Sequence, residues 1–153
     1  MAGPDIVYVS RVPVRRITSI TLAVGTRPPA YASAMGYVLL ADLATAELDR
    51  ILARTDFIPL TPRTITDPSV LQDRLKVVRE QGWAHVDQEL EEGLRSIAVP
   101  VRGNDDSRVF AALGMSSVAR SPSSMIETHL PLLTRAAEEI SERLGSTAPQ
   151  QHR

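Results

Sequence analysis

Residues 83–101 read WAHVDQELEEGLRSIAVPV, and this stretch decides the fold. Its last six residues alternate small and bulky side chains, as a strand does when its two faces differ. A second run of this kind, residues 109–116, follows the turn-forming residues 103–107, so the two runs predict an antiparallel hairpin. A dense group of carboxylates comes just before the first of these strands. The stretch therefore predicts a sheet with one face of small residues.

The rest of the chain mixes strand and helix signals. Further strands are expected at residues 6–10, 17–22 and 83–87. Helices are expected at residues 33–42 with Ser33 as N-cap, after Asp67 and Pro68, and after Ser121 and Pro122. The second helix should bury Leu71, Leu75 and Val78, and the third should bury Leu133, Ala136, Ala137, Ile140 and Leu144, with Pro131 kinking or restarting it. This order predicts an α+β fold with an antiparallel sheet.

Composition limits the classes of protein that fit. The chain has 153 residues, 43% of them apolar, which is enough for one core. A net charge of -1 without a basic block argues against nucleic-acid contact by this stretch itself. No cysteine is present for disulfides or thiolate metal sites, and no apolar run approaches the ~20 residues of a membrane span. We expect a soluble cytoplasmic domain over residues 1–145 without a cofactor, and a disordered tail at residues 146–153.

The hairpin strands predict the position of a pocket. One face, which we expect in the core, carries Ile97, Val99, Val101, Val109, Ala111, Leu113 and Met115. The other face carries Ser96, Ala98, Pro100, Phe110, Ala112, Gly114 and Ser116. Small side chains on the second face leave space, either for a ligand or for a closely packed helix.

A proline-bearing loop leads into the first predicted helix. Residues 27–36 read RPPAYASAMG, and the amides of Met35 and Gly36 at the helix start would suit a carboxylate or phosphate, unless Ser33 caps them. Arg15, Arg16 and Arg27 either compensate an acidic ligand or lie solvated on the surface.

The carboxylate group allows other chemistry. His85, Asp87 and Glu89 have the spacing of one strand face, which would suit a metal, although acidic residues at a strand end are usually solvated. A small α+β enzyme could use Glu89, Glu91 and Glu92 as acid and base. The sequence offers no nucleophile motif, P-loop or HExxH, so we predict neither a catalytic residue nor a metal site. A third alternative is a protein-interaction module without a ligand.

Three segments together carry a family resemblance. They are LAVGTRPPAYASAMGYVLLADL at residues 22–43, GWAHVDQELEEGLRSIAVPV at residues 82–101 and FAALGMSS at residues 110–117. In this order they resemble the C-terminal effector-binding domain of IclR family transcription regulators. Together with RVPVRRI at residues 11–17, they resemble in particular the branch that controls protocatechuate, 4-hydroxybenzoate and β-ketoadipate catabolism. Tyr37 departs from the family's frequent lysine, and Ser96 stands where some members carry cysteine.

The resemblance implies a small-molecule sensor rather than an enzyme. The implied fold is a curved antiparallel sheet of about five to six strands flanked by helices, similar to GAF and profilin-like domains. The implied protein is a homodimer or homotetramer that contacts DNA only through an N-terminal winged helix-turn-helix, which the 153 residues lack. The implied effector contacts are Ala34, Met35, Gly36, Leu94, Ser96, Gly114 and Ser116. To these we add Ser33, Arg16 and Arg27, and Tyr31, whose ring would suit an aromatic acid.

Overall fold

The protein has an α+β fold with one antiparallel sheet. The computed structural model describes residues 3–12, 23–103, 108–118 and 120–146. In chain order their elements are η1 (Ala30–Ala32), α1 (Ala34–Asp42), α2 (Thr45–Leu52), α3 (Pro68–Gln81), β1 (Ala84–Asp87), β2 (Arg95–Arg102), β3 (Val109–Ser117) and α4 (Pro122–Ser146). The predicted fold class and the hairpin of β2 and β3 are confirmed.

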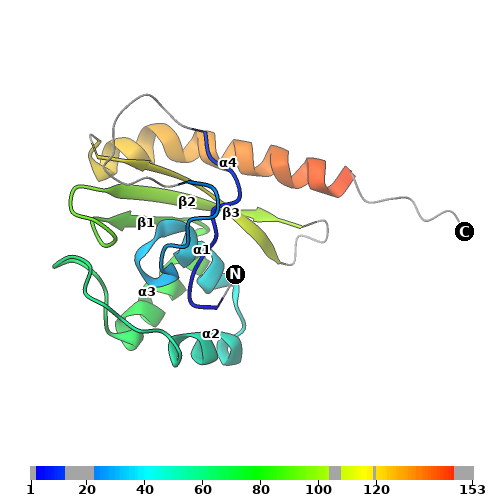
Figure 1. Ribbon diagram of the computed structural model, residues 1–153. Coiled ribbons are helices and arrows are strands. Elements are labelled where there is room, and N and C mark those ends of the chain that lie inside the picture. Colours follow the sequence, from blue (N-terminus) through cyan, green and yellow to red (C-terminus); the bar gives the residue numbers. More distant parts are fainter. Residues whose placement is uncertain (1–2, 13–22, 104–107, 119, 147–153) are drawn as a thin grey trace, which may run out of the picture.

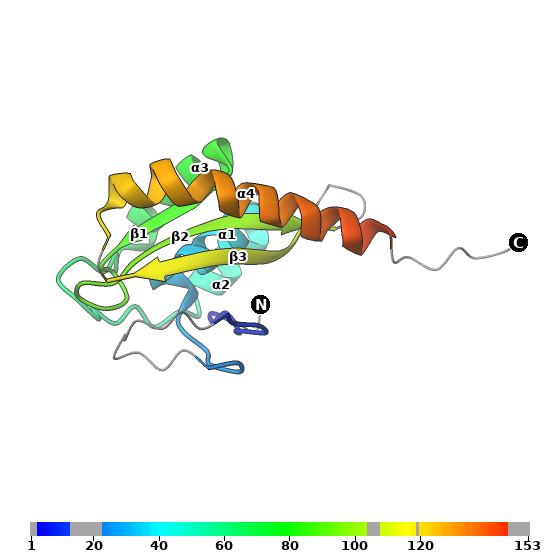
Figure 2. The same ribbon diagram turned by 90° about the horizontal axis from the view of Figure 1, so that it is seen from above.

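The elements form layers on the two faces of the sheet, whose strand order is β1-β2-β3. Helix α4 lies along one face, and α1 lies on the other face with α2 and α3 beyond it (Figure 1, Figure 2). Val99 and Val101 of β2 pack with Ala137 of α4. Ala98 of β2 packs instead into the larger core cluster with α1 and α3. The two faces of β2 therefore serve two separate cores.

The small face follows directly from the strand register. Ser96 pairs with Ser116, Ala98 with Gly114 and Pro100 with Ala112. Directly paired residues in an antiparallel sheet point to the same side, so these six small residues share the face toward α1, as predicted.

One part of the predicted pattern is wrong, because a β-bulge interrupts the register. Val101 pairs with Ala111, but the next residue, Arg102, pairs with Val109. Phe110 is therefore the extra residue, and its side chain is 70% exposed. Beyond the bulge the alternation reverses, so Val109 packs against the α1 cluster rather than the α4 cluster.

The sheet has three strands in the described part of the chain, not the five to six that were predicted. Residues 6–10 form no strand. The amides of Ile6 and Tyr8 donate to the carbonyls of Pro28 and Thr26, each at 3.1 Å. The amides of Gly25 and Ala30 donate in the other direction, to the carbonyls of Tyr8 and Pro4. Pro28 has no N–H to return the bond from Ile6, and the pairing gives one isolated bridge, Asp5 with Pro29, rather than a ladder. The strand predicted at residues 17–22 lies outside the described residues.

The helix starts follow their predicted caps. Ser33 accepts from the amide of Gly36 at 3.1 Å, and Asp67 accepts from the amide of Ser69 at 2.8 Å. Leu71, Leu75 and Val78 of α3 are buried as predicted. The short helix α2 was not predicted as a separate element. Among the described residues, no helix is long and apolar enough to cross a membrane.

The expectations for α4 are wrong in part. The helix continues through Pro131, so this proline does not restart it. Ile140 and Leu144 are 39% and 37% exposed rather than buried. The hydroxyl of Ser141 accepts from the amide of Arg102, the last residue of β2, at 3.0 Å. Helix α4 therefore contacts the end of β2 at this point, and Ile140 and Leu144, on either side of Ser141, stay partly exposed.

Candidate functional site

A small cavity lies between the start of α1 and the small face of the sheet. Its lining residues come from the N-terminal segment, from α1, from the connection between β1 and β2, and from both hairpin strands. They are Tyr8, Ser33, Ala34, Met35, Leu90, Leu94, Ser96, Ile97, Gly114, Met115 and Ser116. The volume is about 10 Å³, close to what one water molecule requires.

On the helix side, two glycines let the chain come close to its neighbours. A Cβ on Gly36 would lie 2.2 Å from the carbonyl oxygen of Ala30, so α1 is seated directly on η1. A Cβ on Gly114 would lie 2.9 Å from Cγ of Met35, so the Met35 side chain rests on the floor of the cavity at Gly114. The helix therefore packs closely against the small face, and Met35 accounts for much of the contact.

On the strand side, polar groups meet an apolar wall. The hydroxyls of Ser96 and Ser116 lie 2.8 Å apart across the strand pair. Leu94, just before β2, is buried, and half-buried Tyr8 adds a phenol whose pKa is raised by burial. This set offers hydroxyl donors beside an apolar surface, a combination that suits a small molecule with both polar and apolar parts.

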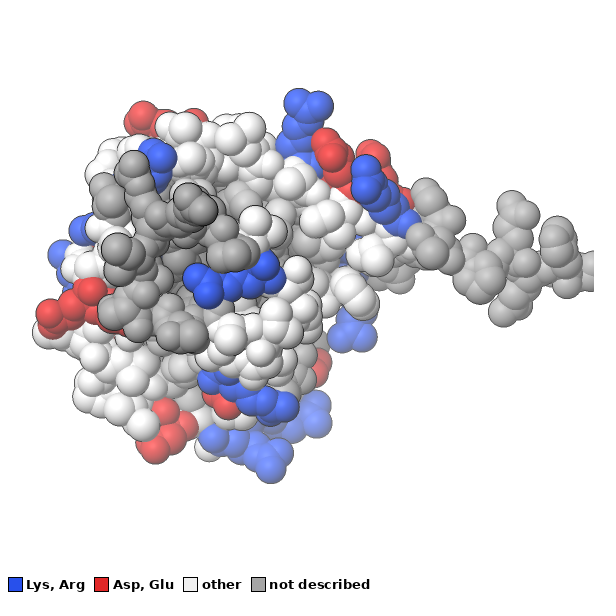
Figure 3. All heavy atoms as spheres, turned by 45° about the horizontal axis from the view of Figure 1, so that its top comes forward, with Lys and Arg blue, Asp and Glu red and all other residues white. Residues whose placement is uncertain are grey.

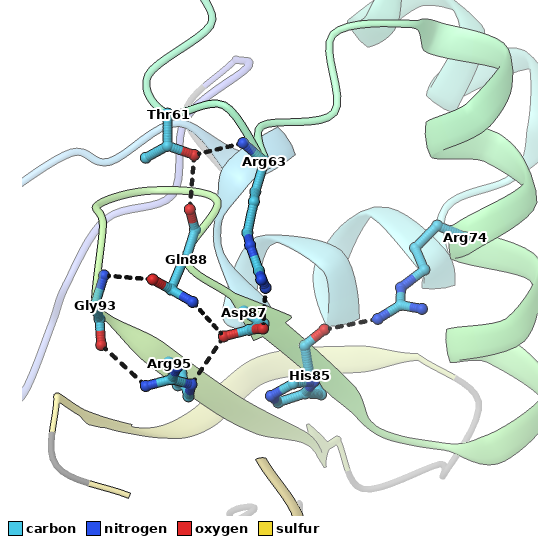
Figure 4. Close-up of polar contacts among 8 residues, drawn as sticks. All are labelled: Thr61, Arg63, Arg74, His85, Asp87, Gln88, Gly93 and Arg95. Atoms are coloured by element: carbon cyan, nitrogen blue, oxygen red, sulfur yellow. Dashed lines mark hydrogen bonds and ion pairs between the residues drawn. The ribbon is translucent and has the colours of Figure 1, made fainter. Parts of the chain in front are cut away.

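The connection between β1 and β2 is held by a polar cluster at its base (Figure 4). Asp87 forms ion pairs with Arg63 and Arg95, the latter at 2.9 Å. Gln88 has a left-handed φ of 61°, which turns the chain out of β1. The side-chain oxygen of Gln88 accepts from the backbone amide of Gly93 at 2.9 Å. The backbone amide of Gln88 donates to the carbonyl of Leu94 at 2.8 Å. These bonds fix Leu94 in the cavity wall.

Glu89 follows this turn and points into the core. Its side chain accepts a short hydrogen bond from the hydroxyl of Tyr37, and the two residues are 7% and 0% exposed. The spacing of His85, Asp87 and Glu89 suggested a shared face, but the turn at Gln88 separates Glu89 from the other two. No group of three potential metal ligands exists among the described residues. Glu92 is exposed, so it does not join buried Glu89 as a catalytic pair.

Two wider grooves lie beside α2. Their volumes are about 490 and 310 Å³, and both are lined in part by Gly3, Glu47 and Ile51. The larger one is bordered by exposed Arg50 and Arg54. Figure 3 shows basic and acidic side chains interspersed over one face of the molecule rather than gathered into a single charged area. The described lining of these grooves contains no pair of hydrogen-bonded hydroxyls like that of the smaller cavity.

Comparison with known proteins shows the family of this chain. Residues 1–142 match the family described as bacterial transcriptional regulator IclR C-terminal. The chain belongs to the IclR family. It is 43% identical to the Pca regulon regulatory protein of Pseudomonas putida over 147 residues, which cover 94% of this chain and 50% of that protein. The chain thus spans about half the length of this IclR relative, which is named as a regulator.

Two solved structures have the same fold as this IclR chain. A putative transcriptional regulator from Rhodococcus has a TM-score of 0.90 and 43% identity, over 95% of this chain and 59% of that one. The inducer-binding domain of the transcription factor PobR from Acinetobacter, solved as a double mutant with 3-hydroxybenzoic acid, has a TM-score of 0.83 and 31% identity. That match covers 92% of this chain and 83% of the PobR domain. The chain therefore has the fold of the effector domain of an IclR regulator.

The structure of this IclR domain brings most of the predicted site residues together. The predicted residues that line the cavity are Ser33, Ala34, Met35, Leu94, Ser96, Gly114 and Ser116. Gly36 does not line it, because its amide already donates to Ser33 and its Cα faces Ala30. Arg27 is exposed and outside the lining, and Arg16 lies outside the described residues.

Tyr31 has a different place from the one predicted. Its hydroxyl donates to the carbonyl of Ile58 and accepts from the amide of Ile58, each at 3.0 Å. Its ring packs against Phe57 at a centroid distance of 5.0 Å. Both hydrogen-bonding roles of the phenol are thus taken, and Tyr31 anchors residues 57–58 instead of lining the cavity.

Four lining residues of the IclR domain were missed from the sequence. They are Tyr8, Leu90, Ile97 and Met115. For Tyr8 a signal existed, because the period of two expected in an extended segment puts Tyr8 on the same side as Ile6. In the structure Ile6 is buried, whereas Val7 and Val9 are exposed. Nothing in the sequence, however, says that this segment folds back to the start of α1.

Replacing Glu89 by glutamine should change how stability depends on pH. Burial raises the pKa of Glu89, so the folded protein holds this proton more strongly than the unfolded chain does. The free energy of unfolding should then fall as pH rises from the ordinary glutamate pKa to the raised value, and level off above it. Urea unfolding between pH 4 and pH 8 should show a smaller fall for Glu89→Gln. The exposed control Glu92→Gln should show the same fall in the free energy of unfolding as the wild type. If Glu89→Gln shows the same dependence on pH as the wild type, the raised pKa of Glu89 is wrong.

Proposed function

We propose that this chain is the sensor domain of an IclR regulator that binds a small organic acid, either aromatic or a dicarboxylic or keto acid, and controls genes of aromatic catabolism. Protocatechuate, 4-hydroxybenzoate and β-ketoadipate are the candidate effectors. The observation that carries the proposal is the cavity at α1, where the hydroxyls of Ser96 and Ser116 face an apolar wall. The relation to the Pca regulon regulatory protein and to the hydroxybenzoate-bound PobR domain supports this class of ligand.

In this proposal the acid lies between Met35 and the small face. Ser96, Ser116 and Tyr8 donate hydrogen bonds to its oxygens, and Leu90 and Leu94 cover its carbon skeleton. A volume of about 10 Å³ holds no ring, whereas pockets for drug-sized ligands have roughly 300 to 1,000 Å³. Binding therefore requires Met35 and the wall around Leu90 and Leu94 to move apart, and this movement is the conformational change that the regulator reads.

The rest of the regulator completes the mechanism. We propose that a winged helix-turn-helix outside these 153 residues contacts DNA, that the protein works in the cytoplasm as a dimer or tetramer, and that the acid shifts the balance between two arrangements of its subunits. A coupling of about 1 to 3 kcal/mol would change operator affinity roughly 5- to 150-fold. The proposed role is sensing, without turnover of the acid.

A ligand screen on this chain tests the proposal. At one hundred times its dissociation constant, an effector should add about 2.7 kcal/mol to the free energy of unfolding and raise the Tm by about 5 to 10 °C. Calorimetry on Ser96→Ala and Ser116→Ala should show roughly tenfold weaker binding or worse, because each loses a bond to a charged oxygen. The control Arg50→Ala, in the groove beside α2, should bind as wild type does. The proposal would be wrong if only Arg50→Ala lost binding, or if no acid raised the Tm.

A further inference from the structure

The buried hydrogen bond between Tyr37 and Glu89 joins two elements that are far apart in sequence. Tyr37 belongs to α1, and Glu89 lies in the connection between β1 and β2. Both side chains are almost fully buried, at 0% and 7% exposure. A hydrogen bond to a carboxylate in such surroundings is strong and costly to break, because the carboxylate would stay buried without its donor.

The position of this bond relates it directly to the cavity. Ala34, in the cavity wall, precedes Tyr37 by three residues, so the two lie one turn apart on the same flank of α1. Leu90, in the opposite wall, follows Glu89 directly. The bond therefore ties the helix wall to the loop wall immediately beside the proposed effector site.

The loop wall, which is the connection between β1 and β2, is also held by hydrogen bonds from residues 61 and 64. The hydroxyl of Thr61 donates to the carbonyl of Gln88, and the hydroxyl of Thr64 donates to the carbonyl of Glu89, both at 2.7 Å. The first of these bonds is visible in Figure 4. The backbone of Gln88 and Glu89 is thus held by these two bonds, and the bond to Tyr37 joins this held backbone to α1.

We propose that Tyr37 and Glu89 are a positioning pair that holds the effector cavity in its closed form and thereby sets the affinity for the effector. This inference rests on the proposed function. An acid that needs a wider cavity binds only the molecules that are open. Its apparent dissociation constant is therefore the dissociation constant of the open form divided by the open fraction. Removing the Tyr37 hydroxyl increases the open fraction, and binding becomes tighter.

The first test is affinity, with 4-hydroxybenzoate as the probe. Calorimetry should give Tyr37→Phe a dissociation constant about three- to tenfold below that of the wild type. The matched control is Tyr31→Phe, which removes a buried tyrosine hydroxyl that binds Ile58 instead of Glu89 and should leave the affinity unchanged. A purely structural role predicts weaker binding from damage to the fold. Equal or weaker binding by folded Tyr37→Phe therefore overturns the proposal.

The second test needs no ligand. Amide hydrogen exchange should be about tenfold faster in Tyr37→Phe at Gly36, Gln88, Gly93 and Leu94, whose amides hold the two walls, and unchanged in α4. Unchanged exchange at these amides overturns the proposal even where affinity cannot be measured. Faster exchange in a protein that binds none of the acids would mean that the pair positions the walls and that the proposed effector class is wrong.

Discussion

Replacing Gly36 by alanine is expected to lower the free energy of unfolding by more than about 3 kcal/mol. The added Cβ would lie 2.2 Å from the carbonyl oxygen, 2.5 Å from Cα and 2.7 Å from the carbonyl carbon of Ala30. These are backbone atoms, and they have no rotamer by which to move away. Either α1 separates from η1, or η1 leaves its place in the core.

Both movements would cost free energy, because η1 is packed in the core. Ala30 and Ala32 of η1 are 1% and 0% exposed, and the amide of Ala30 donates to the carbonyl of Pro4 at 3.0 Å. Thermal unfolding should show a Tm lower by about 10 °C or more. The control is Gly82→Ala, since Gly82 has a left-handed φ of 81° but open space around it. Its cost should be near 1 kcal/mol, from backbone strain alone. If Gly36→Ala proves as stable as Gly82→Ala, the close packing of α1 on η1 is wrong.

Local signals in the sequence predicted the parts of the fold that local chemistry determines. Ser33 and Asp67 are cap residues whose side chains satisfy amides three or fewer residues ahead, and both helices start where expected. The small face was predictable because side chains alternate along a strand with a fixed period. The strand side of the candidate site therefore needed only residues that are near each other in the chain, whereas the other lining residues come from distant segments.

Features that depend on distant contacts were not predictable in this way. The bulge at Phe110 reverses the alternation by one residue, and no local signal marks it. Tyr31 was matched to an aromatic ligand because its ring suits one, but Ile58 takes both of its hydrogen-bonding roles from 27 residues away. For Gly36 the sequence left two alternatives, a ligand or the cap hydroxyl of Ser33, and Ser33 takes the amide. For Tyr31 and Gly36, a protein partner therefore satisfies the group that the sequence left open.

Gly114 should show the opposite balance from Gly36, with a small effect on folding and a large effect on the effector. A Cβ on Gly114 would meet Cγ and Sδ of Met35 at 2.9 and 3.2 Å, and these atoms belong to a flexible thioether that can shift. Its nearest backbone contact, the carbonyl oxygen of Ile97, lies at 3.2 Å. The free energy of unfolding of Gly114→Ala should therefore stay within about 1 kcal/mol of wild type.

The same methyl group would occupy the floor of the proposed effector site. Binding of 4-hydroxybenzoate to Gly114→Ala should weaken by about tenfold or more, which is roughly 1.4 kcal/mol, because the ring and the displaced Met35 then compete for less space. Shortening Met35 should relieve this competition. The double variant Gly114→Ala with Met35→Ala should therefore recover most of the affinity, which makes the two substitutions strongly non-additive. Wild-type affinity in Gly114→Ala, or a double variant that binds as weakly as Gly114→Ala does, would show that the acid does not lie between Met35 and the small face.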